Sequence, residues 1–156
     1  MEINTINIIY LILFFILGLV LGSFYNVVGL RLCKGESLIY PPSHCTKCNH
    51  KLKFYELVPV FSYIFLKGRC KNCKEKINII YPVIEFLTGI LFALSYYVYG
   101  LSPSLVYSLL LSSLFIIITV TDLNYYIIPD SILIFFGLLI FIYNIITKGI
   151  LDACTY

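Results

Sequence analysis

The sequence predicts an all-α, polytopic membrane protein with about four transmembrane helices and a four-cysteine loop between the first two. Only 12% of the 156 residues are charged and 60% are apolar, whereas a soluble domain carries roughly 25% charged residues. The apolar residues gather in four long runs separated by polar segments. A helix that crosses a bilayer needs about 17–25 mostly apolar residues, so each run is a candidate span.

The first span is expected within residues 1–30, where an apolar run extends from Ile6 to Leu30. Only Glu2 precedes this run, without the basic residues of a secretory signal, so we expect it to remain as a helix. Within it, Gly22 allows close contact with another helix and Asn26 can donate a hydrogen bond across helices. The other three runs are Ile77 to Tyr99, Leu105 to Val120 and Ile132 to Thr147. Lipid offers no hydrogen bonds to the backbone, so all four should be α-helical.

Basic residues concentrate in residues 31–78, between the first and second spans. Ten of the eleven lysines and arginines lie from Arg31 to Lys76, against three acids, Glu36, Glu56 and Glu75. Loops rich in Lys and Arg stay on the cytoplasmic side. We therefore expect this loop and the later turn from Thr121 to Asp130 to be cytoplasmic, and the N-terminus to lie outside. A basic segment beside a span sets topology and contacts anionic lipid, so nucleic acid is not expected as a partner.

Two CxxC pairs lie in the same loop, Cys45 with Cys48 and Cys70 with Cys73, and twenty-one residues separate the pairs. This spacing is typical of a zinc site with four thiolates, in which each tight turn directs two sulfurs at one ion. Four thiolates leave no open position for chemistry, so the expected role of the zinc is structural. A redox CxxC pair and two disulfides are the alternatives, although thiols in a cytoplasmic loop are kept reduced.

The remaining loop residues carry weaker expectations. His44 and His50 flank the first cysteine pair and are expected to be solvated rather than metal ligands. Cys33 and Cys154 have no predicted partner. Short strands are expected around Leu52 to Phe54 and Ile77 to Ile79.

Acidic residues mark the beginning of the second span and the end of the third. Glu85 lies in the first turns of the second span and Asp122 closes the third. Ionisable groups at membrane depth are costly and usually face a protein interior or a water-filled cavity. Asp122 is therefore a candidate catalytic residue, with an interfacial helix end as the alternative explanation. Asp130 follows Pro129 and precedes an apolar run, which indicates the N-cap of the fourth helix.

Six segments resemble, in order, the bifunctional prepilin peptidase and N-methyltransferase family. They are Gly22 to Val28 with Arg31, Pro42 to Cys45, Leu57 to Tyr63, Leu66 to Cys70, Ile79 to Glu85, and Asp122 to Asp130. The resemblance implies an aspartyl peptidase of the bacterial cytoplasmic membrane that removes the basic leader of type IV prepilins or pseudopilins. Many members then methylate the new N-terminus with S-adenosylmethionine. It also implies that Asp122 is the first catalytic aspartate, that Cys45, Cys48, Cys70 and Cys73 hold zinc, and that Glu85 has a methyl-transfer or structural role.

The family's second catalytic aspartate belongs to a Gly-x-Gly-Asp motif, which this sequence lacks. Gly149 to Asp152 has the wrong spacing and is expected on the opposite side of the membrane. Residues 79–156 are therefore expected to be the start of an incomplete peptidase domain, truncated before that motif. The alternative is a non-catalytic membrane zinc-knuckle protein that binds a pilin or a secretion component. A small transporter that uses Glu85 and Asp122 would leave the cysteines unexplained.

Overall fold

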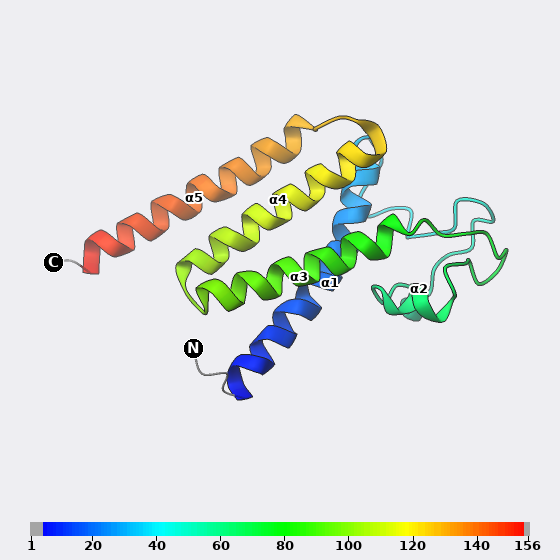
Figure 1. Cartoon of the computed structure of the whole chain (residues 1–156). Helices are drawn as coiled ribbons and strands as arrows, with labels where there is room; N and C mark the ends of the chain where they lie inside the picture. The colour runs from blue at the N-terminus through cyan, green and yellow to red at the C-terminus, as the bar shows by residue number, and fades with distance from the viewer. Residues whose placement is uncertain (1–4, 155–156) are drawn as a thin grey trace.

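A computed structural model describes the backbone of residues 5–154 and the side chains of residues 5–147. Four long helices account for most of the chain (Figure 1). They are α1 (Thr5–Leu32), α3 (Ile80–Tyr99), α4 (Pro103–Tyr125) and α5 (Asp130–Cys154). Two short helical turns, η1 (Phe54–Glu56) and α2 (Phe61–Phe65), lie in the loop between α1 and α3. This arrangement confirms the predicted helical fold.

The four long helices are also long and apolar enough to cross a membrane. Each corresponds to one of the predicted apolar runs, although α3 begins at Ile80 rather than Ile77 and the other three helices extend beyond their runs. The loop-side end of α1 reaches Leu32, and α4 runs five residues past Val120 to Tyr125. Asp122 consequently lies in the last turn of α4, in agreement with the expectation that it closes the third span.

Glycines let α1 and α3 pack closely against each other. A Cβ atom added to Gly22 of α1 would lie 2.9 Å from the Cα of Glu85 in α3, and one added to Gly89 would lie 2.9 Å from the ring of Phe15. The Asn26 amide donates across the same interface to the backbone oxygen of Tyr81, with an N···O distance of 3.2 Å. Both expectations for the first span, close contact at Gly22 and a hydrogen bond from Asn26, are confirmed.

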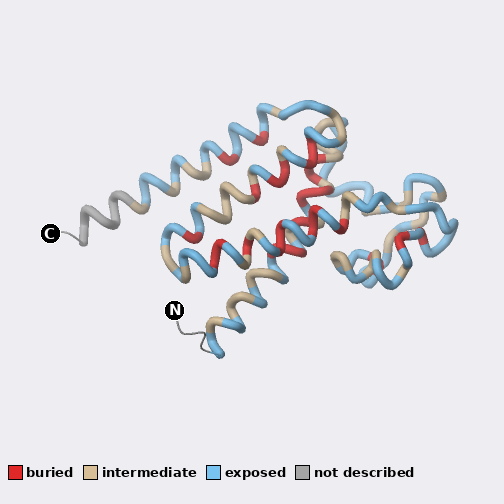
Figure 2. Tube along the Cα trace, in the orientation of Figure 1, coloured by how far each residue is buried: buried red, intermediate tan, exposed pale blue. Residues whose placement is uncertain are grey.

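The best-buried part of the bundle is where the cysteine loop joins it. We call this the loop end: α1 finishes there at Leu32, α3 begins at Ile80, and α4 turns into α5 between Tyr125 and Asp130. Figure 2 shows buried positions gathered towards this end. The core there consists of Tyr25, Val28, Ile84, Ile116, Ile117, Val120, Ile132 and Phe136. The loop is therefore attached to the most firmly packed part of the protein.

Two contacts hold the helices together near the loop end. The Tyr25 hydroxyl of α1 donates to the Ser113 hydroxyl of α4 at 2.7 Å. The Tyr125 hydroxyl, in the last turn of α4, donates to the backbone oxygen of Leu30 at 3.2 Å. Tyr126 then takes a left-handed conformation (φ 54°) that stops α4. The ends of α1 and α4 are thus fixed side by side.

The loop contains no strand within the described residues, so the short strands expected at 52–54 and 77–79 are wrong. Only two isolated antiparallel bridges form, His44 with Lys51 and Arg69 with Lys76. Each bridge closes around one CxxC pair, and the pairing extends into no strand. Phe54 begins η1 instead of ending a strand.

Candidate metal centre and candidate catalytic aspartate

The four cysteines converge on a single point although they come from opposite ends of the loop. Their sulfur atoms all lie within 4.8 Å of one another. Two cross-pair distances are 3.7 Å, from Cys45 to Cys73, and 3.9 Å, from Cys48 to Cys70. Zn–S bonds of about 2.3 Å in a tetrahedron place sulfurs about 3.8 Å apart, so these separations fit a zinc ion. Disulfides are not formed at these distances, because an S–S bond is about 2.05 Å long.

The two CxxC pairs are held by matching backbone turns. The Cys45 N–H donates to the His50 oxygen at 3.0 Å, and the Asn49 N–H returns to the Cys45 oxygen at 2.9 Å. In the second turn, the Cys70 N–H donates to the Glu75 oxygen at 2.8 Å, and the Lys74 N–H returns to the Cys70 oxygen at 3.0 Å. Asn49 and Lys74 occupy the same position in the two turns and both have positive φ, 54° and 60°. The sequence repeats one local structure twice and sets the copies face to face.

Backbone dipoles favour thiolates in the first turn. The N–H groups of Cys48 and Lys47 point at the Cys45 sulfur and lower the pKa of that thiol to about 6. The His50 N–H lowers the pKa of the Cys48 thiol in the same way. Metal binding requires deprotonated cysteines, so both effects favour a bound cation. The Lys71 ammonium, next to Cys70, donates to the Tyr55 hydroxyl at 2.8 Å.

A buried carboxylate organises the stretch between the two turns. Glu56 accepts the Lys53 N–H at 2.7 Å, and the same oxygen lies 3.2 Å from His50 Nε2. The hydrogen bond from Lys53 is the main cause of a lowered pKa for Glu56, and the contact with His50 adds to it. His50 is therefore half-buried and paired rather than simply solvated. His44 is exposed, and neither histidine belongs to the four-sulfur cluster.

A second buried carboxylate joins the loop to the helices. Glu85 of α3 accepts the N–H of Val60 at 2.7 Å. Val60 has φ 62° and ψ −50°, a conformation that a β-branched residue adopts rarely and at a cost of about 1–3 kcal/mol. This contact supports the structural role for Glu85. Sequence reasoning identified Glu85 as unusual but could not find its partner, since twenty-five positions separate the two residues and no motif connects them.

Asp122 is exposed in the last turn of α4, at the loop end. The Asp122 backbone oxygen accepts the Tyr126 N–H at 2.9 Å, and this hydrogen bond closes the last turn of α4. Figure 1 shows this end of α4 beside the end of α1 from which the cysteine loop departs. The carboxylate is therefore available at the same end of the bundle as the four-cysteine cluster.

The remaining residues singled out from the sequence are Asp130, Cys33, Asp152 and Cys154. Asp130 is exposed. It was expected at the N-cap, but it is the first residue of α5 itself, so the N-cap position falls one residue earlier. Cys33 follows α1 as a free, half-buried thiol, and burial raises its pKa. Asp152 and Cys154 fall beyond the described side chains.

Comparison with known proteins places these features in a family. Residues 16–99 match the model of the bacterial peptidase A24 N-terminal domain. A prepilin leader peptidase/N-methyltransferase of Bacillus subtilis is 43% identical over 122 residues, which cover 78% of this chain and 49% of that protein. The protein of the same name from Myxococcus xanthus is 38% identical over 123 residues, covering 79% of this chain and 37% of the relative. A third protein of this name, from Neisseria gonorrhoeae, is 36% identical over 151 residues, covering 80% of this chain and 53% of the relative.

The chain spans about half the length, or less, of these curated relatives. No solved structure matches it significantly. The family match nevertheless covers more than half of the 156 residues and includes the cysteine loop and the Glu85 contact. With its four membrane-spanning helices and its cluster of four cysteines, this protein belongs to the prepilin leader peptidase/N-methyltransferase family.

Proposed function

We propose that this chain contributes to a membrane aspartic endopeptidase that removes the basic leader of type IV prepilins or pseudopilins. Asp122 is the catalytic residue that the chain supplies. The observation that carries this proposal is the exposure of Asp122 at the loop end, where the family's cysteine loop is also attached. Residues 31–78 then form the cytoplasmic loop. This loop follows the first span and precedes an incomplete peptidase domain that begins at residue 79.

The proposed chemistry needs two carboxyl groups. Two neighbouring aspartates do not both ionise readily, so one keeps a proton while the other accepts a proton from the attacking water. The protonated partner then polarises the carbonyl of the peptide bond to be cut. This chain contains no Gly-x-Gly-Asp sequence, so the partner of Asp122 must come from outside these 156 residues.

The orientation we propose brings the substrate to this site. The basic loop holds the loop end at the cytoplasmic face of a bacterial inner membrane, where an uncleaved leader is located. The four cysteines would hold a structural zinc ion there. Methylation of the new N-terminus with S-adenosylmethionine is the second activity that the names of the relatives support.

The first test is intact-mass measurement of a prepilin produced together with this chain. A parallel set of measurements uses a chimera, in which residues 1–130 of this chain replace the matching N-terminal part of the Bacillus subtilis relative. The rest of that relative is kept as the source of the partner carboxylate. Each is compared with its Asp122→Asn variant. Asp130→Asn serves as the matched control, since it makes the same substitution at the other exposed aspartate of the segment from Asp122 to Asp130.

Loss of the leader mass with the unmodified and Asp130→Asn proteins, but not with Asp122→Asn, supports the proposal. Processing that survives Asp122→Asn contradicts it. A prepilin left uncleaved by both the chain and the chimera favours the alternative, a non-catalytic zinc-knuckle protein that binds a pilin or another secretion component.

A further inference from the structure

The short helix α2 presents apolar side chains that the protein does not cover. Phe61, Ile64 and Phe65 are 53%, 62% and 82% exposed. In an aqueous loop such a group of side chains would be costly, because each buried CH₂ is worth about 0.8 kcal/mol. The position of α2 relative to the membrane decides what covers them.

The length of α3 sets the depth of α2. Twenty residues at about 1.5 Å each make α3 about 30 Å long, the thickness of the hydrocarbon core. Glu85 is the sixth residue of α3 and therefore lies about 8 Å inside the helix's first residue. Because Glu85 accepts the Val60 N–H at 2.7 Å and helical side chains lean toward the helix N-terminus, the beginning of α2 is held beside the first two turns of α3.

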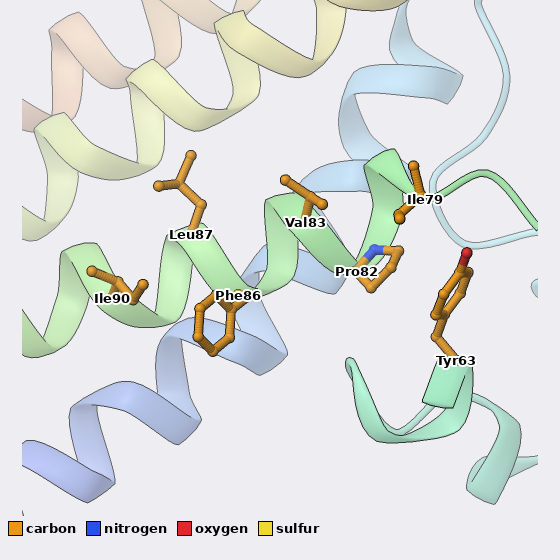
Figure 3. Close-up of a pocket in the computed structure, with 7 residues that line it drawn as sticks. All are labelled: Tyr63, Ile79, Pro82, Val83, Phe86, Leu87 and Ile90. Atoms are coloured by element: carbon orange, nitrogen blue, oxygen red, sulfur yellow. The ribbon is translucent and has the colours of Figure 1, made fainter. Parts of the chain in front are cut away.

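An apolar groove leads to the same conclusion independently. Tyr63 of α2 forms one wall, and Pro82, Val83, Phe86 and Ile90 of α3 form the other (Figure 3). The groove has a volume of about 390 Å³ and, apart from the Tyr63 hydroxyl, apolar walls. Val83 and Phe86 are 54% and 48% exposed, as expected for side chains that face lipid. Through Tyr63, α2 thus lies beside the first residues of α3, at one end of an exposed apolar face of that helix.

We propose that α2 is an in-plane membrane anchor. Phe61, Ile64 and Phe65 insert between the acyl chains just below the head groups, and acyl chain fills the groove behind Tyr63. Lys67 and Arg69 follow α2 directly and reach the anionic phosphates. The proposal concerns how the loop contacts the bilayer and does not depend on prepilin cleavage.

The Glu85 contact has a specific purpose at this depth. The first N–H groups of a helix have no partner within the helix, and hydrocarbon offers none. The Val60 N–H is such a group, and the Glu85 carboxylate satisfies it. A carboxylate near the head groups is what allows an irregular segment to start a helix below the membrane surface.

The sequence contains no tryptophan, so a single introduced indole reports on one position. The complete chain carrying Phe65→Trp is placed in vesicles of phosphatidylethanolamine and phosphatidylglycerol with added brominated phosphatidylcholine. Bromines near the head group should quench its fluorescence more strongly than bromines near the chain ends, and iodide in the buffer should quench it weakly. Ile16→Trp, an exposed position midway along α1, is the deep reference and should show the opposite order of quenching.

Two outcomes would overturn the proposal. Strong iodide quenching without bromine quenching would place α2 in water. A blue-shifted emission that neither iodide nor bromine quenches would show that protein covers α2, either a second copy or another chain. In the Phe65→Trp background, Glu85→Ala should reduce quenching by the shallow bromines, whereas Glu85→Gln, which keeps an acceptor oxygen, should preserve it. Equal quenching in the two Glu85 variants would rule out Glu85 as the group that holds α2.

Discussion

Gly18 of α1 and Thr88 of α3 approach so closely that a Cβ atom on Gly18 would lie 2.6 Å from the Thr88 carbonyl oxygen. The next nearest atom, the Gly89 Cα, would be 2.7 Å away. Both belong to the backbone, so neither can turn aside as a side chain would. Small residues at such crossings allow membrane helices to gain van der Waals contact along their backbones.

Gly18→Ala should therefore separate α1 from α3. Overpacking of this kind costs about 1–3 kcal/mol. The measurement is the temperature at which detergent-solubilised protein loses its monodisperse peak in size-exclusion chromatography. Gly137→Ala is the matched control, because a Cβ there meets nothing within 4 Å and alanine favours a helix. Equal behaviour of the two variants would contradict the close packing.

Replacing Cys45 and Cys48 together by serine should release the metal. Two ligands cannot retain zinc as four do, so the metal content measured by plasma mass spectrometry should fall from about one ion per chain to near zero. The loop should also become sensitive to protease, since its fold depends on the centre. Cys33→Ser keeps all four ligands and should retain the metal, and a metal-free unmodified chain would refute the site.

Glu56→Ala should loosen the stretch between the two cysteine turns. The change removes the acceptor of the Lys53 N–H and the partner of His50, a loss comparable to that of a helix cap, about 1 kcal/mol. Hydrogen exchange of residues 52–57 should accelerate at neutral pH. Glu36→Ala alters an exposed acid of the same loop and should leave this exchange unchanged.

Tyr25→Phe tests the polar contact between α1 and α4. The variant keeps the buried ring but removes the donor to Ser113, which still donates to the Leu109 oxygen at 2.7 Å. Hydrogen bonds between membrane helices contribute about 0.6 kcal/mol on average, so the expected loss of thermal stability is small. Tyr97→Phe, at a position that is 53% exposed, should produce none.

The sequence predicted what depends on composition and spacing. Hydropathy identified all four long helices, and the two CxxC pairs identified the cluster that the structure assembles. The extent of α4 to Tyr125 was missed because polar residues near Asp122 resemble a turn while they continue the helix. The strand expected at Leu52 to Phe54 was wrong because Glu56 draws the backbone there into η1.

Contacts between distant segments could not be predicted in the same way. Nothing in the residues around Val60 shows that its N–H meets Glu85, since the contact exists only once α3 and the loop are both folded. The role of Asp122 remains a prediction, because its exposed position at the loop end is compatible with catalysis without requiring it.

The glycine contacts between α1 and α3 have a thermodynamic consequence for the loop that these helices carry. Closing a flexible segment costs conformational entropy, which grows with the logarithm of its length. Here the segment from Cys33 to Ile79 starts and ends on two helices that already pack against each other through Gly18, Gly22 and Gly89. The packing of α1 against α3 therefore already holds the two ends of this segment close together. Metal binding has only to order the residues between those ends.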